Sequence, residues 1–419
     1  MSFDLIVKGG TLPDGRQADI AIRAGRIAAI EASIDAPAAE VIDATGKLVS
    51  PPFVDAHFHM DSTLSYGRPR VNASGTLLEG IALWGELKLI QTRDEILDRA
   101  LDYCRQAVGQ GVLAIRSHVD VTDPTFHNVE ALLEVRDKVK GILDLQLVAF
   151  PQDGWFRTPQ GAAQVIRALD AGVDIVGGIP HFERSMADGA ASVRAACHLA
   201  AERGLMVDLH CDESDDPLSR HIETLAAETI AFGLQGRVAG SHLSSMHSMD
   251  NYYVAKLLPL IAEARVAAIP NPLINITLQG RIDTYPKRRG MTRVPELLAA
   301  GVTVAFGQDC VKDPWYPLGS GDMLDVAHMG LHVALMTAPD QMRMCFDMVT
   351  TTPAQIMGLE FGLLIGARGS LVVLDCTDAV EAIRLRPARL AVVSDGRVVA
   401  RTVPKATDVI GFAERGTPR

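Results

Sequence analysis

The stretch KLVSPPFVDAHFH, residues 47–59, decides the fold, because a largely apolar run ends there in two histidines that are two positions apart. In an extended chain, residues two apart project from the same face, so His57 and His59 can grip one ion. An HxH pair alone is a weak signal, since such pairs are often structural. The pair gains meaning only where other strands of the same sheet end in similar side chains.

Seven further apolar runs follow, and helical patterns separate most of them. They are VLAIRSHVDV (112–121), DLQLVAFPQ (144–152), VDIVGGIP (173–180), LMVDLHCDE (205–213), RVAGSHLS (237–244), RVAAIPNP (265–272) and VTVAFGQDC (302–310). Thr92 to Glu95 has the pattern of a capping box, which predicts a helix that stops at Gly109. Eight such units with continuously apolar strands favour an α/β fold with a closed (β/α)8 TIM-type barrel. An open doubly wound sheet is the alternative.

The two ends of the chain have a different pattern. Short strand-like segments divided by Gly, Pro and Asp fill most of residues 4–50, and the same pattern returns after Gly362. We expect these ends to pair into a small β-sandwich domain of residues 1–50 and 362–419. The catalytic barrel then covers residues 51–361.

Composition excludes several classes of protein. Apolar residues make up 48% of the chain and charged residues 22%, as in an ordinary globular protein. The net charge of -11 offers no general attraction to nucleic acid or anionic lipid. The N-terminal segment lacks a signal-peptide pattern and no apolar run is long enough for a membrane helix, so a cytoplasmic address is expected. The six cysteines have no CxxC spacing, which argues against a disulfide framework and a thiolate zinc site.

Active sites of such barrels lie at the carboxyl ends of the strands. Polar side chains stand where the apolar runs stop: His57, His59, Gln152, His210, Glu213, His242 and Asp309. Three imidazoles and one carboxylate suit zinc or ferrous iron. We therefore predict one divalent metal ion, Zn or Fe(II), held by His57, His59, His210 and Asp309.

Other polar residues near these strand ends allow two interpretations. Glu213 lies three residues after His210, where it can move protons for a metal-activated water, but it also belongs to the acidic run DESDD of a possible solvated loop. Cys211 adjoins His210 and should point to the outer face, as a packing residue. His118 and His181 also end strands, so they are either core histidines or part of the pocket wall.

The order of these motifs resembles the amidohydrolase superfamily along the whole chain. Six segments are similar to bacterial cytosine deaminases: PPFVDAHFHMD (51–61), SGTLLEGI (74–81), LVAFPQDG (147–154), VDLHCDE (207–213), NPLINITLQGRIDTYPKRRG (271–290) and DPWYPLG (313–319). The resemblance implies a hydrolytic deaminase that acts on a small free base, and it suggests a homo-oligomer. The superfamily's two-metal members carry a bridging lysine on the fourth strand, whereas this chain reads VGGIPHFE there, so one metal is expected.

The same resemblance implies a role for each site residue. His57, His59, His210 and Asp309 match the ligands of a single-metal site. Glu213 matches the acid that carries protons to the ring, and His242, with Asp309, matches the group that orients or deprotonates the water. Gln152 matches the amide that bonds the carbonyl edge of the substrate, while Leu77 and Trp315 match apolar walls.

One position departs from the pattern. Bacterial cytosine deaminases usually carry two consecutive aspartates at the end of strand eight, whereas this chain reads GQDCVKDPWY, with Cys310 second. A thiol is smaller and less hydrated than a carboxylate, so a methyl group at C5 of the pyrimidine could fit beside it. We therefore favour 5-methylcytosine over cytosine as substrate, with isoguanine as a third candidate. The alternatives of another class are a cyclic amidohydrolase and a binding protein without activity.

Overall fold

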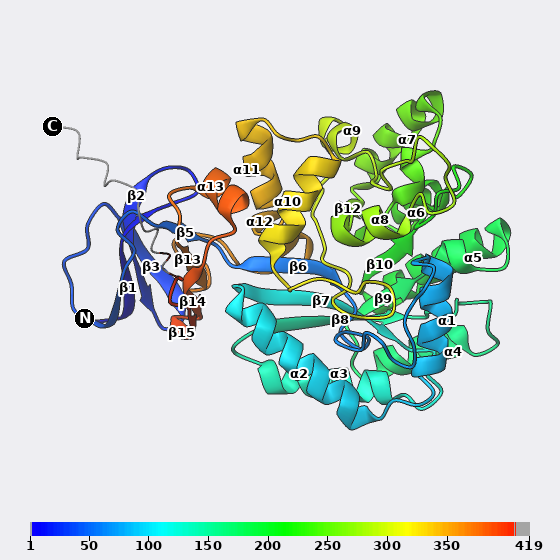
Figure 1. Cartoon of the computed structure of the whole chain (residues 1–419), viewed down its shortest axis with the longest axis horizontal. Coiled ribbons are helices and arrows are strands. Elements are labelled where there is room, and N and C mark those ends of the chain that lie inside the picture. Colours follow the sequence, from blue (N-terminus) through cyan, green and yellow to red (C-terminus); the bar gives the residue numbers. More distant parts are fainter. Residues whose placement is uncertain (1, 406, 408–419) are drawn as a thin grey trace.

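The computed structural model describes residues 2–405 and 407, and its larger part is a parallel barrel. Seven strands lie in the sheet in the order of the chain: β6 (Phe53–Phe58), β7 (Val112–Asp120), β8 (Asp144–Phe150), β9 (Ile175–Gly178), β10 (Met206–Cys211), β11 (Val238–His242) and β12 (Ala267–Ile269). All neighbouring pairs are parallel. The predicted barrel class is confirmed (Figure 1).

The eighth predicted strand, 302–310, closes the barrel without forming a regular strand. It meets β12 through a bridge between Val304 and Ala268, and it meets β6 through a bridge between Asp309 and Phe58. The amide of Asp309 also donates to the carbonyl of His57 at 2.8 Å. Asp309 has a φ of 68°, and this left-handed turn interrupts the extended backbone that a strand requires.

Helices surround the barrel and fill its connections. They are α1 (Leu77–Leu87), α2 (Arg93–Gly109), α3 (His127–Val139), α4 (Gly161–Asp170), α5 (Met186–Arg203), α6 (His221–Ala231), α7 (Asn251–Ala264), α8 (Pro272–Leu278), α9 (Val294–Ala299), α10 (Met323–Val333), α11 (Pro339–Asp347) and α12 (Thr351–Ile356), with short 3-10 turns η1 (Pro180–Phe182) and η2 (Ser244–His247). The predicted capping box starts α2, because Thr92 and Glu95 bond each other's backbone amides.

The chain ends form one mixed sheet beside the barrel (Figure 1). Its strands are β1 (Phe3–Thr11), β2 (Gln17–Arg23), β3 (Arg26–Glu31), β4 (Ala38–Asp43), β5 (Leu48–Ser50), β13 (Leu371–Leu374), β14 (Arg389–Ser394) and β15 (Arg397–Arg401), and α13 (Ala379–Leu385) connects β13 to β14. β5 pairs with β13 in antiparallel register, so the predicted pairing of the two ends is confirmed. The domain boundaries stay a prediction, and residues 1, 406 and 408–419 of the predicted domain lie outside the described residues.

The hydrophobic core is continuous from the barrel strands to the helices around them.

All six cysteines are buried free thiols. Among the described residues, no helix combines the length and the apolar character needed to cross a membrane.

Candidate active site

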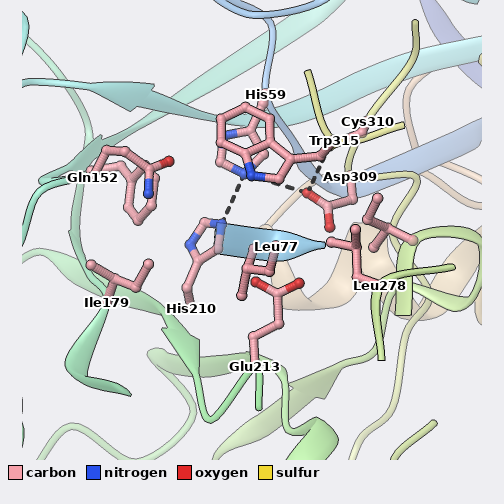
Figure 2. A pocket seen from close by; sticks show the side chains of 12 residues that line it. His59, Leu77, Gln152, Ile179, His210, Glu213, Leu278, Asp309, Cys310 and Trp315 are labelled. Carbon is pink, nitrogen blue, oxygen red and sulfur yellow. Dashed lines mark hydrogen bonds and ion pairs between the residues drawn. The ribbon is translucent and has the colours of Figure 1, made fainter. Parts of the chain in front are cut away.

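Four side chains from three regions of the barrel converge at the carboxyl ends of its strands. His57 lies in β6, His59 directly follows it, His210 lies in β10, and Asp309 lies on the irregular closing segment. One donor atom from each residue lies within 4.8 Å of the others. Asp309 Oδ1 is 3.4 Å from Nε2 of His57 and 3.4 Å from Nε2 of His59. Figure 2 shows His59, His210 and Asp309 directed toward one point.

The atoms of this cluster fit a metal ion. Nε2 of His59 and Nε2 of His210 lie 2.8 Å apart, and both rings are buried. Within the part of the chain that the structure describes, Nε2 of His57 has no hydrogen-bond partner. A cation between these nitrogens satisfies all three lone pairs, and a site of three imidazoles and one carboxylate is suited to zinc or ferrous iron.

Burial keeps two of these imidazoles neutral. It lowers the pKa of His59 to about 4 and lowers the pKa of His210 well below its usual range. A neutral imidazole has the free lone pair that metal binding needs. These rings are therefore ready to bind a metal ion at neutral pH.

Two buried carboxyl groups of the site have pKa values that are shifted in opposite directions. Burial, together with the charge of Asp309, raises the pKa of Glu213 well above its usual range. Burial also acts to raise the pKa of Asp309, but His242 and His57 outweigh it and lower that pKa. The two pKa values are thus shifted in opposite directions, which is the arrangement of a proton donor beside a charged group.

Some acidic residues of the run after β10 support the fold, and one lines the pocket. Asp212 accepts hydrogen bonds from the amides of His221 and Ile222 and from the hydroxyl of Ser219, so it fixes the start of α6. Asp215 accepts from the amide of Gly280. Glu213 is the member that lines the pocket, as Figure 2 shows, so the solvated-loop interpretation does not apply to it.

His242 ends β11 and faces both carboxyl groups. Its Nδ1 is 3.5 Å from Glu213 Oε1, and its Nε2 is 3.8 Å from Asp309 Oδ2. The side-chain amide of Asn275 lies 3.0 Å from Nδ1, and that of Asn271 lies 3.3 Å from Nε2. Sequence reasoning missed both asparagines, although Asn271 lies near the end of the predicted seventh apolar run, 265–272.

The pocket beside this cluster is lined by every predicted substrate residue. Gln152 and Cys310 lie on opposite sides of it, while Leu77 and Trp315 cover it (Figure 2). Sequence reasoning missed the remaining apolar walls, which are Phe150, Ile179, Ile274 and Leu278. Ile274 and Leu278 are four residues apart on α8, so helical spacing in the segment 271–290 was the available signal.

Cys310 lies in an apolar part of the wall. It is only 3% exposed and packs in one cluster with Ile274, Leu278 and Trp315. Burial raises the pKa of its thiol well above the usual range. Cys310 therefore presents a neutral, weakly polar surface next to Asp309.

His118, His181 and Cys211 lie outside the pocket. His118 packs behind the cluster, with ring centroids 4.2 Å from His57 and 4.5 Å from His210. Nδ1 of His181 lies 3.1 Å from the carbonyl of His210. Neither residue lines the pocket. Cys211 is buried in the core around the barrel, as a packing residue.

Comparison with known proteins agrees with this geometry. A family model described as "Amidohydrolase family" matches residues 40–400. N-isopropylammelide isopropyl amidohydrolase of Pseudomonas sp. (strain ADP) is 30% identical over 95% of this chain and 98% of its own length. Pterin deaminase of Rhizobium rhizogenes is 29% identical over 93% of this chain and 89% of its own length.

A crystal structure of 5-methylcytosine deaminase from Klebsiella pneumoniae, liganded with 5-fluorocytosine, superimposes with a TM-score of 0.93. It is 39% identical to this chain and covers 96% of it, and 99% of that structure is matched. The cluster of His57, His59, His210 and Asp309 is typical of the metal site of amidohydrolases. The chain therefore belongs to the amidohydrolase family and is a metal-dependent hydrolase that acts on a C–N bond.

Proposed function

We propose that this enzyme deaminates 5-methylcytosine to thymine, and that it also accepts cytosine. The observation that carries the proposal is Cys310, a buried thiol in an apolar cluster where it borders the substrate pocket beside Asp309. The 39% identity to a 5-methylcytosine deaminase supports the same substrate. Water adds to the ring carbon that bears the amino group, and ammonia leaves, so a C–N bond is replaced by a C=O bond.

The proposed metal ligands are His57, His59, His210 and Asp309, and the proposal is supported by donor atoms that lie within 4.8 Å of one another. A divalent metal held by these residues would lower the pKa of a water molecule, so that hydroxide would be available near neutral pH. The donor set suits Zn and Fe(II) equally.

Glu213 is the proposed general acid. Because its pKa is raised, Glu213 keeps its proton to a higher pH than an ordinary glutamate and is suited to deliver it to the ring nitrogen next to the reacting carbon. Asp309 stays ionised, and together with His242 it can orient a water molecule and take its proton. The proton can then pass to the amino group, which leaves as ammonia, while the remaining proton of the added hydroxyl returns to Glu213 as the C=O bond forms.

Gln152 and Cys310 are proposed to recognise opposite edges of a flat base. The Gln152 amide can bond the carbonyl edge, while Leu77 and Trp315 cover the ring. At the other edge, the Cys310 thiol can contact a C5 methyl group without the desolvation cost of a carboxylate. Burial of one methyl group stabilises the bound base by about 0.8 kcal/mol, which corresponds to roughly fourfold in kcat/KM.

The decisive experiment compares kcat/KM for cytosine, 5-methylcytosine and isoguanine in the native enzyme and in Cys310→Asp. We expect the native enzyme to prefer 5-methylcytosine, and we expect Cys310→Asp to shift the preference toward cytosine. Cys376→Ser, which changes a cysteine outside the pocket, should keep the native ratio. If cytosine is the best substrate and Cys310→Asp leaves the ratio unchanged, the assignment is wrong. Ammonia release without ring opening of a hydantoin separates deamination from cyclic amide hydrolysis.

A further inference from the structure

A chain of buried polar side chains runs behind the metal-ligand cluster. It contains Arg116 of β7, Asp208 of β10, Ser241 of β11 and His57 of β6, and each side chain is fully buried. Arg116, Asp208 and Ser241 do not line the substrate pocket. Among the side-chain hydrogen bonds of the described residues, that between Ser241 and His57 is the one that joins them to a proposed ligand.

Three short contacts connect these residues. Arg116 Nη1 donates to Asp208 Oδ2 at 2.9 Å, and Ser241 Oγ donates to Asp208 Oδ1 at 2.8 Å. Nδ1 of His57 lies 2.9 Å from Ser241 Oγ. His118 Nε2 is 3.7 Å from Asp208 Oδ1, which is too long for a hydrogen bond.

The number of available protons fixes the direction in which these hydrogen bonds are donated. The Asp208 carboxylate only accepts hydrogen bonds, so the single hydroxyl proton of Ser241 points to Asp208. Ser241 Oγ must then accept a proton from His57, which places the ring proton on Nδ1. The lone pair of His57 therefore lies on Nε2, the atom 3.4 Å from Asp309 Oδ1.

We infer that Asp208 and Ser241 are positioning residues that hold His57 in the tautomer able to bind the metal through Nε2. The inference rests on the ligand role proposed for His57. A second metal ion between His57, His118 and Asp208 is a poor alternative, although their donor atoms also lie within 4.8 Å of one another. The Arg116 guanidinium already neutralises Asp208, and Ser241 already occupies Nδ1 of His57.

Substitutions of Ser241 and Asp208 should weaken zinc binding to different degrees. Ser241→Ala removes the acceptor for the His57 proton and should weaken zinc binding by about 10-fold. Asp208→Asn must turn its oxygen to Arg116, because a guanidinium only donates. Its amide group then donates to Ser241, whose hydroxyl proton turns to Nδ1 of His57. The ring proton moves to Nε2, and zinc binding should weaken by about 100-fold.

The double variant Ser241→Ala/Asp208→Asn separates this mechanism from a merely structural role. Without the Ser241 hydroxyl, the reversed proton direction cannot reach His57, so zinc affinity should return to the level of Ser241→Ala. If the residues only support the fold, the two losses should add. The measurement is the dissociation constant for Zn²⁺ by competition with a chelator, together with the thermal midpoint of each variant.

Two controls make every outcome decisive. Ser192→Ala removes a buried hydroxyl of α5 that bonds the Gly189 carbonyl, and it should leave zinc affinity unchanged. His57→Gln should weaken zinc binding strongly. If it does not, the ligand assignment fails. If it does while Ser241→Ala binds zinc like the native enzyme, the positioning role alone is refuted. This comparison decides the question even where Asp208→Asn does not fold.

Discussion

Glu213 and Asp309 face the same pocket, and their surroundings shift their pKa values in opposite directions. Asp309 is surrounded by His57, His59 and His242, whereas Glu213 has burial and the Asp309 charge acting against its ionisation. A pair of carboxyl groups separated in this way can supply one proton donor and one charged group at the same pH. The separate roles proposed for Glu213 and Asp309 in deamination follow from this difference in pKa.

Glu213→Gln should therefore separate metal binding from turnover. The amide keeps the size of the side chain but cannot deliver a proton, so kcat should fall by about 10²–10⁴-fold. Metal content, measured by elemental analysis, and the thermal midpoint should stay near native values. Near-native turnover in this variant would remove Glu213 from the role of general acid.

Gly80 of α1 supports the aromatic wall of the pocket. A Cβ atom at this position would lie 2.2 Å from Cδ1 of Trp315, so the indole must move in Gly80→Ala. We expect a raised KM, unchanged metal content, and a loss of about 1–3 kcal/mol in stability from overpacking. Gly85→Ala is the matched control, because a Cβ there meets nothing within 4 Å. Equal KM values in the two variants would show that Trp315 does not shape substrate binding.

The residues that ended apolar strands could be predicted from the sequence, because a strand end places its side chain at the mouth of a barrel. The structure brings His57, His59, His210 and Asp309 together for this reason. Asp208 and Ser241 could not be found in this way, since they lie inside strands and not at their ends, and the sequence pattern does not indicate which side chains they contact. Asn275 was also missed, because its contact with His242 depends on the packing of α8 against the barrel.

Lys88, which directly follows α1, is the main contact of this helix with the substrate side of the barrel. Lys88 Nζ donates to Asp120 Oδ2 at 3.1 Å, to Thr122 Oγ1 at 3.0 Å and to Asp153 Oδ2 at 2.6 Å. Trp84 Nε1 also donates to Asp120 Oδ2 at 2.8 Å. Asp153 directly follows Gln152, so the same contacts hold the amide proposed to recognise the base.

Lys88→Met should leave the buried Asp120 carboxylate without its cation. Breaking a buried pair in this way costs about 3–5 kcal/mol, so the free energy of unfolding should fall by this order. KM should rise more than kcat falls, because Gln152 loses its support while Glu213 does not. Lys138→Met is the control, since Lys138 forms an exposed i,i+4 pair with Glu134. A change confined to stability, with a native KM, would refute the link to Gln152.

The strand order of the barrel was predictable because continuous apolar runs alternate with helical patterns. The irregular closing segment was not, because its left-handed Asp309 and its backbone bonds to β6 depend on the closed barrel itself. The pairing of the chain ends followed from their shared strand pattern. Their arrangement as one mixed sheet depends on contacts between β5 and β13, far apart in the chain.

At the scale of the whole molecule, Arg389 connects the sheet of the chain ends to the barrel. It begins β14, is 3% exposed, and forms an ion pair with Asp322, the residue that caps α10. Its Nε also donates to the carbonyl of Gln110, directly after α2, at 3.0 Å. One buried cation thus joins three elements that belong to different regions of the sequence.

Arg389→Met should destabilise the protein in a pH-dependent way. Burial already raises the pKa of Asp322, and Arg389 opposes this shift, so the variant should raise that pKa further. A carboxyl group whose folded pKa exceeds its unfolded value binds more protons in the folded state, so stability falls as pH rises. The loss should approach about 3–5 kcal/mol at neutral pH and shrink as pH falls toward about 4, the unfolded value. Thermal midpoints of native, Arg389→Met and the exposed-pair control Arg384→Met, measured from pH 5 to 8, check this. A loss in Arg389→Met that stays constant across this range would show that Asp322 is not the group left uncompensated.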